Sequence, residues 1–135
     1  MSEDLYQQAI LDLAKAATGA GRLDDADASV TLDNPLCGDR ITIDVKIADG
    51  HLAAVAHKVR GCALCEAAAA VIGSEAAGRP VDELRAIHGD INAMLTSEAT
   101  PPWPALAAFD PVRAFKSRHE CVLLPFEALA EALDT

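Results

Sequence analysis

The chain has 135 residues, of which 51% are hydrophobic but only 4% aromatic, so we predict one compact domain with an aliphatic core. Its 21 acidic and 11 basic residues give a formal net charge of −10. This balance repels phosphate backbones and anionic lipids, which argues against nucleic acid and membrane partners. The acidic start Met1–Asp4 and the shortness of the apolar runs predict a cytoplasmic protein with no targeting or membrane-spanning segment.

The first part of the chain alternates between helical and strand patterns. Apolar residues spaced by three and four predict an opening helix over residues 5–16. A short strand is expected over 28–32, and strict apolar–polar alternation predicts a second over 40–47. Asp49-Gly50 is a strong signal for a two-residue hairpin turn, so residues 51–60 are expected to return as a third, antiparallel strand.

Beyond Gly61 the apolar spacing becomes helical, and a proline-rich stretch over 100–104 interrupts it. A run of strands followed by a run of helices indicates an α+β fold. We expect a three-stranded antiparallel sheet with helices packed on one face, in addition to the N-terminal helix. The expected later helices cover residues 62–77, 82–97, 106–115 (one or two short helices around Pro111) and about 120–133, with Pro125 tolerable only near the first turn.

The four cysteines suggest a metal site rather than disulfides, because the chain is expected in a reducing compartment. Gly38 separates Cys37 from Asp39 and lets the loop turn tightly enough for both side chains to face one point. Cys62 and Cys121 fall at expected helix starts, where backbone N–H groups stabilise a thiolate. If the loop and both helix starts meet, three thiols and one displaceable carboxylate form a four-coordinate site for zinc or iron.

The same segments resemble a known family. They are Asn34-Pro35-Leu36-Cys37-Gly38-Asp39-Arg40-Ile41, Gly61-Cys62-Ala63-Leu64, and Arg118 followed by Cys121, Leu124 and Leu129. In this order they are similar to the U-type iron–sulfur cluster assembly proteins, the family of IscU, SufU and NifU N-terminal domains. The long stretch between the second and third motifs resembles the SufU branch more than the IscU branch. The resemblance implies a single SufE/NifU-like domain over residues 1–135.

By this resemblance, Cys37, Cys62 and Cys121 are the three family cysteines and Asp39 is the family aspartate. Family members carry a nascent 2Fe–2S cluster or a zinc ion on these residues. They receive persulfide sulfur from a pyridoxal-phosphate cysteine desulfurase, on the cysteine matching Cys37 in the SufU branch or Cys121 in the IscU branch. Arg118 matches an arginine that helps at the desulfurase encounter. Downstream iron–sulfur assembly or acceptor proteins are the further implied partners.

For each of three residues beside these motifs, the sequence allows alternative roles. Cys65 follows Cys62 by one helical turn, so it is either a further ligand or redox partner, or a small core residue. His119 is either a neighbour of the metal or a solvated rim histidine. Glu120 replaces the basic residue of the family and is either a fourth ligand or a helix-start carboxylate.

The functional prediction is therefore a scaffold or carrier that accepts sulfur and holds a metal or labile cluster. A zinc-dependent sulfurtransferase that builds no cluster is the first alternative, so enzymatic activity stays open. A structural zinc domain or a dithiol redox domain using Cys62 and Cys65 is the second alternative. The sequence leaves open the metal, the sulfur-accepting cysteine, the identity of the desulfurase and the oligomeric state.

Overall fold

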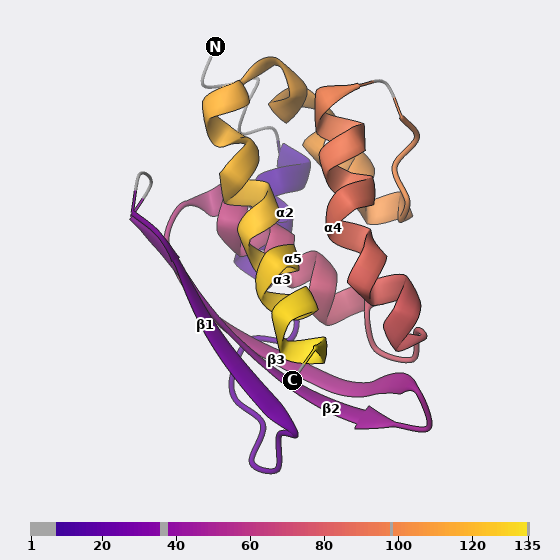
Figure 1. Cartoon of the computed structure of the whole chain (residues 1–135). Helices are drawn as coiled ribbons and strands as arrows, with labels where there is room; N and C mark the ends of the chain where they lie inside the picture. Colours follow the sequence, from indigo (N-terminus) through magenta and orange to yellow (C-terminus); the bar gives the residue numbers. More distant parts are fainter. Residues whose placement is uncertain (1–7, 36–37, 98, 135) are drawn as a thin grey trace.

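The computed structural model describes residues 8–35, 38–97 and 99–134 and has the predicted α+β architecture (Figure 1). The strands follow one another directly, and most of the helical chain comes after them. The elements are helix α2 (Gln8–Ala16), strands β1 (Ala28–Asn34), β2 (Asp39–Ala48) and β3 (His51–Arg60), helices α3 (Ala63–Glu75) and α4 (Val81–Thr96), the 3-10 helices η1 (Pro104–Ala114) and η2 (Lys116–Arg118), and helix α5 (His119–Leu133).

The strands form one antiparallel sheet in the order β1-β2-β3. Asp49 and Gly50 connect β2 to β3 with φ angles of +54° and +77°, as a two-residue hairpin turn with two left-handed residues requires. The alternation in β2 places Ile41, Ile43 and Val45 in the core. Ile47 is only partly buried, because the register shifts between Lys46 and Ile47.

The helices cover one face of this sheet, as predicted (Figure 1). Helix α5 packs on β1 and β2, while α3 packs on β3; α4 lies against α5, and α2 lies against α3. The alanine run Ala67–Ala70 of α3 is buried, so small side chains let neighbouring elements approach closely. Trp103 is buried and meets Phe126 edge-on, with 6.0 Å between ring centroids.

Several helix boundaries differ from the predictions. The opening helix is described from Gln8 onwards, and residues 5–7 of the predicted helix lie outside the described residues. The segment after Trp103 winds as a 3-10 helix that contains Pro111. Pro125 is the seventh residue of α5 and so lies beyond its first turn. Because proline has no N–H, Pro125 cannot donate the usual helical hydrogen bond to the carbonyl of Cys121. None of the described helices combines the length and the apolar character needed to cross a bilayer.

The outer face of the sheet carries a buried carboxylate that the alternation pattern assigned to solvent. Asp44 is only 1% exposed, because the segment after α2 crosses the sheet above it. Its oxygens accept hydrogen bonds from Arg22 Nε (2.7 Å), Ser29 Oγ (2.6 Å) and the Leu23 N–H (3.0 Å). Burial raises the pKa of Asp44, but these hydrogen bonds outweigh it, and the pKa lies below its usual value.

We expect Asp44→Asn to destabilise the fold by about 2 kcal/mol, because it removes the charge from a buried acceptor of several hydrogen bonds. Since the folded-state pKa is lowered, the carboxylate stabilises the fold above its ordinary pKa, and this stability is lost as the pH falls through the folded-state value. Urea unfolding at pH 7 and at about pH 3 measures both effects. Asp33→Asn, at the exposed Asp33–Arg40 pair, is the control and should lose much less.

Candidate metal-binding site

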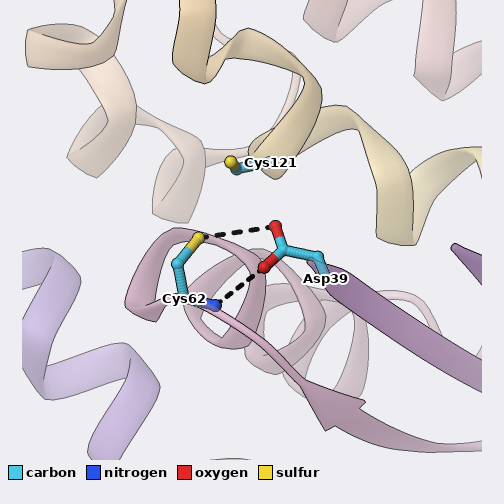
Figure 2. A group of neighbouring side chains, drawn as sticks. All are labelled: Asp39, Cys62 and Cys121. Atoms are coloured by element: carbon cyan, nitrogen blue, oxygen red, sulfur yellow. Dashed lines mark hydrogen bonds between the residues drawn. The ribbon is translucent and has the colours of Figure 1, made fainter. Parts of the chain in front are cut away.

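Three separate elements bring a carboxylate and two thiols together at one end of the sheet (Figure 2). Asp39 is the first residue of β2, Cys62 caps the N-terminus of α3 directly after β3, and Cys121 lies in the first turn of α5. One oxygen of Asp39 and the two sulfur atoms all lie within 4.8 Å of one another. The structure therefore brings together three of the four predicted ligands.

The backbone of Asp39 is held by the β1–β2 hairpin, and its carboxylate is held by hydrogen bonds from Cys62. It pairs with Asn34 across the β1–β2 hairpin, and the N–H of Gly38 donates to the carbonyl of Asn34 at 2.8 Å. The φ of Gly38 is +72°, a left-handed conformation that glycine adopts without strain. The Asp39 carboxylate is 1% exposed; Oδ1 accepts from the Cys62 N–H at 2.9 Å, and Oδ2 accepts from the Cys62 thiol at 3.5 Å (Figure 2).

Cys37, the fourth predicted ligand, lies outside the described residues, as does Leu36. Covalent geometry still bounds its distance from the site, because two residues of extended chain span at most about 7 Å between Cα atoms.

The environment of Cys62 favours its thiolate. A hydrogen bond from Cys121 is the largest influence and lowers the pKa of Cys62, while burial and the negative charge of Asp39 raise it. The backbone N–H groups of Leu64 and Cys65, at the start of α3, lower it further. The resulting pKa is about 7, against an ordinary 9.0, so a large fraction of Cys62 is ionised at neutral pH and suited to bind metal or attack sulfur.

The neighbouring candidate residues do not join the donor group formed by the described residues. Cys65 is completely buried in the hydrophobic core, and its backbone N–H interacts with Cys62. His119 is buried rather than solvated at the rim, with Nε2 3.1 Å from the Val112 carbonyl and 3.2 Å from that of Arg113. Glu120 is exposed, and Arg118 is partly exposed at the end of η2.

Gly61 is a site residue that sequence reasoning missed. A Cβ built at this position would lie 2.8 Å from Cγ of Asp39 and closer still to its Oδ1. Only a residue without a side chain therefore leaves room for the carboxylate in its observed position. The sequence held a weak signal for this, because Gly61 directly precedes Cys62 where a strand meets a helix.

We expect Gly61→Ala to displace the Asp39 carboxylate and weaken zinc binding by at least about tenfold, comparable to the loss of a group that orients a ligand. Competition with a chromophoric chelator measures the affinity. Gly89→Ala in α4 is the matched control, because a Cβ there would meet no atom within 4 Å. Equal zinc affinity of the Gly61→Ala variant and the wild type would contradict this positioning role.

Comparison with known proteins identifies the class of domain that this fold and donor group define. The model of the family described as the NifU-like N terminal domain matches residues 5–109, and the chain belongs to this family. Cys121 lies beyond the matched residues, but several individual relatives align with 96% or 97% of the chain.

Three relatives illustrate the similarity. The iron–sulfur cluster assembly scaffold protein IscU of Thermotoga maritima is 28% identical over 131 residues, covering 96% of this chain and 92% of the relative. The zinc-dependent sulfurtransferase SufU of Bacillus subtilis is 27% identical over 135 residues, covering 97% and 90%. The crystal structure of a nitrogen-fixing NifU-like protein (N-terminal) from Brucella abortus superposes with a TM-score of 0.90 at 34% identity, covering 98% of this chain and 94% of that one. Identity to the first two is nearly equal and does not separate the IscU and SufU branches.

Proposed function

We propose that this chain is a single-domain iron–sulfur cluster assembly scaffold and sulfur acceptor, spanning residues 1–135. It takes persulfide sulfur from a pyridoxal-phosphate cysteine desulfurase and holds a metal or a labile 2Fe–2S cluster on Cys37, Asp39, Cys62 and Cys121. The observation that carries this proposal is the meeting of Asp39, Cys62 and Cys121 from three distant parts of the chain, with their donor atoms within 4.8 Å. The iron–sulfur scaffold named among the relatives supports it.

The sulfur transfer requires an accessible thiolate on this chain. The thiolate attacks the outer sulfur of the desulfurase persulfide, so one S–S bond forms while the S–S bond to the desulfurase breaks and leaves its cysteine as a thiolate. Of the two candidate acceptors, Cys121 is completely buried. The proposal therefore makes Cys37 the first acceptor, with Cys62 and Cys121 as the residues that receive the sulfur next. Arg118 is the proposed docking residue for the desulfurase.

The donor set suits a cargo that must be released again. Thiolates bind zinc and iron firmly, whereas a single carboxylate oxygen is the weakest member of such a set. Asp39 keeps its hydrogen bond from the Cys62 N–H, which would hold the carboxylate beside the site whether or not it binds the cargo. This arrangement would let the Asp39 carboxylate release and rebind the cargo without rearrangement of the sheet. The final acceptors of the cargo would be downstream iron–sulfur proteins.

A zinc-dependent sulfurtransferase is the second candidate function. The Bacillus subtilis relative of that name aligns with 97% of this chain. Three cysteines and one aspartate also fit the four-coordinate tetrahedral site that zinc prefers. In this case bound zinc would fix the fold of the site and hold its thiols deprotonated, and the chain would relay sulfur without building a cluster.

Anaerobic reconstitution separates the two functions. The purified chain is incubated with ferrous iron, cysteine and a cysteine desulfurase, and visible absorption is followed while zinc is quantified in parallel. A 2Fe–2S spectrum supports the scaffold, whereas tightly held zinc with faster desulfurase turnover and no spectrum supports the relay. Absence of cluster, zinc and persulfide together would reject both functions and leave the dithiol or structural alternative.

A further inference from the structure

The outer face of the sheet carries a concentration of positive charge in a chain whose net charge is −10. The register places Arg40 opposite Arg60 and Thr42 opposite Lys58. Directly opposed residues share one face, and the intervening Ile41 and Ile43 point into the core, so these four side chains face away from the helices. We call these four residues the basic face.

Two of the three cations of the basic face lack the acidic partner that most other cations of the described residues have. Arg40 pairs with the exposed Asp33 at 2.6 Å, but Lys58 and Arg60 form no ion pair with any residue of the described segments. Arginines placed directly opposite each other on adjacent strands also repel and destabilise a sheet. By contrast, most other cations contact an acidic side chain: Arg22, Lys46, Arg79, Arg85 and Arg113.

The basic face is also hollowed. A cavity of about 290 Å³ is lined by Arg40, Thr42, Lys58, Val59 and Arg60. Arg40 and Arg60 also line a second hollow, together with the acidic Asp33 and Asp39. Arg60 is two residues from Cys62 along the chain. The surface is therefore concave, cationic and continuous with the end of the sheet that carries the donor group.

We infer that the basic face is a docking surface for an extended, acidic segment of a partner protein. Lys58 and Arg60 are alternate residues of one strand, about 7 Å apart, which is also the spacing of alternate side chains in an extended peptide. Carboxylates at every second position of such a peptide would meet both cations. The acidic remainder of the surface repels the same peptide, so charge alone directs it to this face. This inference goes beyond the proposed function and does not depend on it.

A nuclear magnetic resonance titration tests the inference on the full chain. The probe is a synthetic peptide of about ten residues in which Glu and Thr alternate, added to the 15N-labelled protein at low salt. We expect saturable amide shifts that cluster at residues 40–42 and 58–60 and weaken as salt screens the charges. A peptide with Gln in place of every Glu should leave these amides unchanged.

Three double variants make the result specific. Lys58→Glu with Arg60→Glu should weaken peptide binding by at least about tenfold, because attraction becomes repulsion. The control, Lys15→Glu with Lys116→Glu, has the same net charge but changes exposed cations outside the basic face, and it should bind as the wild type does. Lys58→Gln with Arg60→Gln should lose binding without added repulsion. Thermal unfolding of each variant verifies its fold.

Four results would overturn the inference: no shifts, shifts scattered over the surface, equal binding of the Gln peptide, or equal loss in both charge-reversed variants. Stronger binding of an oligothymidylate at the same amides would assign the face to nucleic acid instead. The same shifts with inorganic phosphate alone would assign it to a small anion. Zinc and cluster binding are measured on the same variants, so a failure of the docking surface is distinguishable from a failure of the proposed function.

Discussion

Replacing Cys121 with alanine in the metal-free protein is expected to raise the pKa of Cys62 above its value of about 7. The hydrogen bond from Cys121 is the largest influence that lowers the pKa of Cys62 to about 7. Without it, burial and the charge of Asp39 oppose the backbone N–H groups of α3, and the pKa should return towards the ordinary 9.0. At pH 7, the thiolate fraction of Cys62 should fall well below the one half, roughly, that a pKa of about 7 gives.

The pH dependence of alkylation measures this shift, with mass spectrometry to identify the modified cysteine. Cys65→Ser is the matched control, because it keeps the backbone N–H that faces Cys62 and should leave the midpoint near pH 7. An unchanged midpoint in Cys121→Ala would show that the helix N-terminus alone sets the pKa. That outcome would mean that Cys121 of α5 does not influence the ionisation of Cys62 at the start of α3.

The same lowered pKa links the metal-free site to stability. In the unfolded chain the Cys62 thiol has its ordinary pKa near 9.0, whereas in the fold it is about 7. Ionised Cys62 therefore stabilises the fold fully above the unfolded-state pKa, and this contribution is lost as the pH falls through 7. The effect has the same sign as that of Asp44, whose pKa is also lowered, but it acts in a higher pH range.

The sheet was predictable because its signals are local. Alternation along β2 and the pair Asp49-Gly50 depend only on neighbouring residues, and the structure places the hairpin where both patterns indicate it. The segment after Trp103 was less predictable, since a 3-10 helix that contains Pro111 has no strong period of its own. Its placement follows from packing of the buried Leu106, Phe109 and Val112.

Of the candidate site, the sequence predicted only the donor residues. Motif spacing identified Asp39, Cys62 and Cys121, but the role of Gly61 depends on where the Asp39 side chain lies after folding. Asp44 shows the same limit, because its burial results from Arg22 and Leu23 crossing the sheet, and no pattern within β2 encodes that contact. Residues whose role arises from distant backbone placement are therefore the ones that sequence patterns miss.

Cys62→Ser is expected to weaken zinc binding by about 100-fold or more, because it removes a thiolate that zinc prefers to a hydroxyl oxygen. Cys62 lies within 4.8 Å of the other described donors and is held there by its backbone hydrogen bond to Asp39. Chelator competition at pH 7.5 with the full chain measures the affinity. Circular dichroism of the metal-free variant verifies that the fold is retained.

Cys65→Ser is the decisive comparison, since Cys65 follows Cys62 by one helical turn and has the same chemistry. Its side chain is completely buried in the core, so a hydroxyl there should cost about 1–3 kcal/mol of stability while zinc affinity stays within about threefold of the wild type. If instead Cys65→Ser lost zinc as severely as Cys62→Ser, Cys65 would be a ligand. The site would then use the Cys62 and Cys65 pair of a structural zinc or dithiol domain, and Asp39 would lose its assigned place in the ligand set.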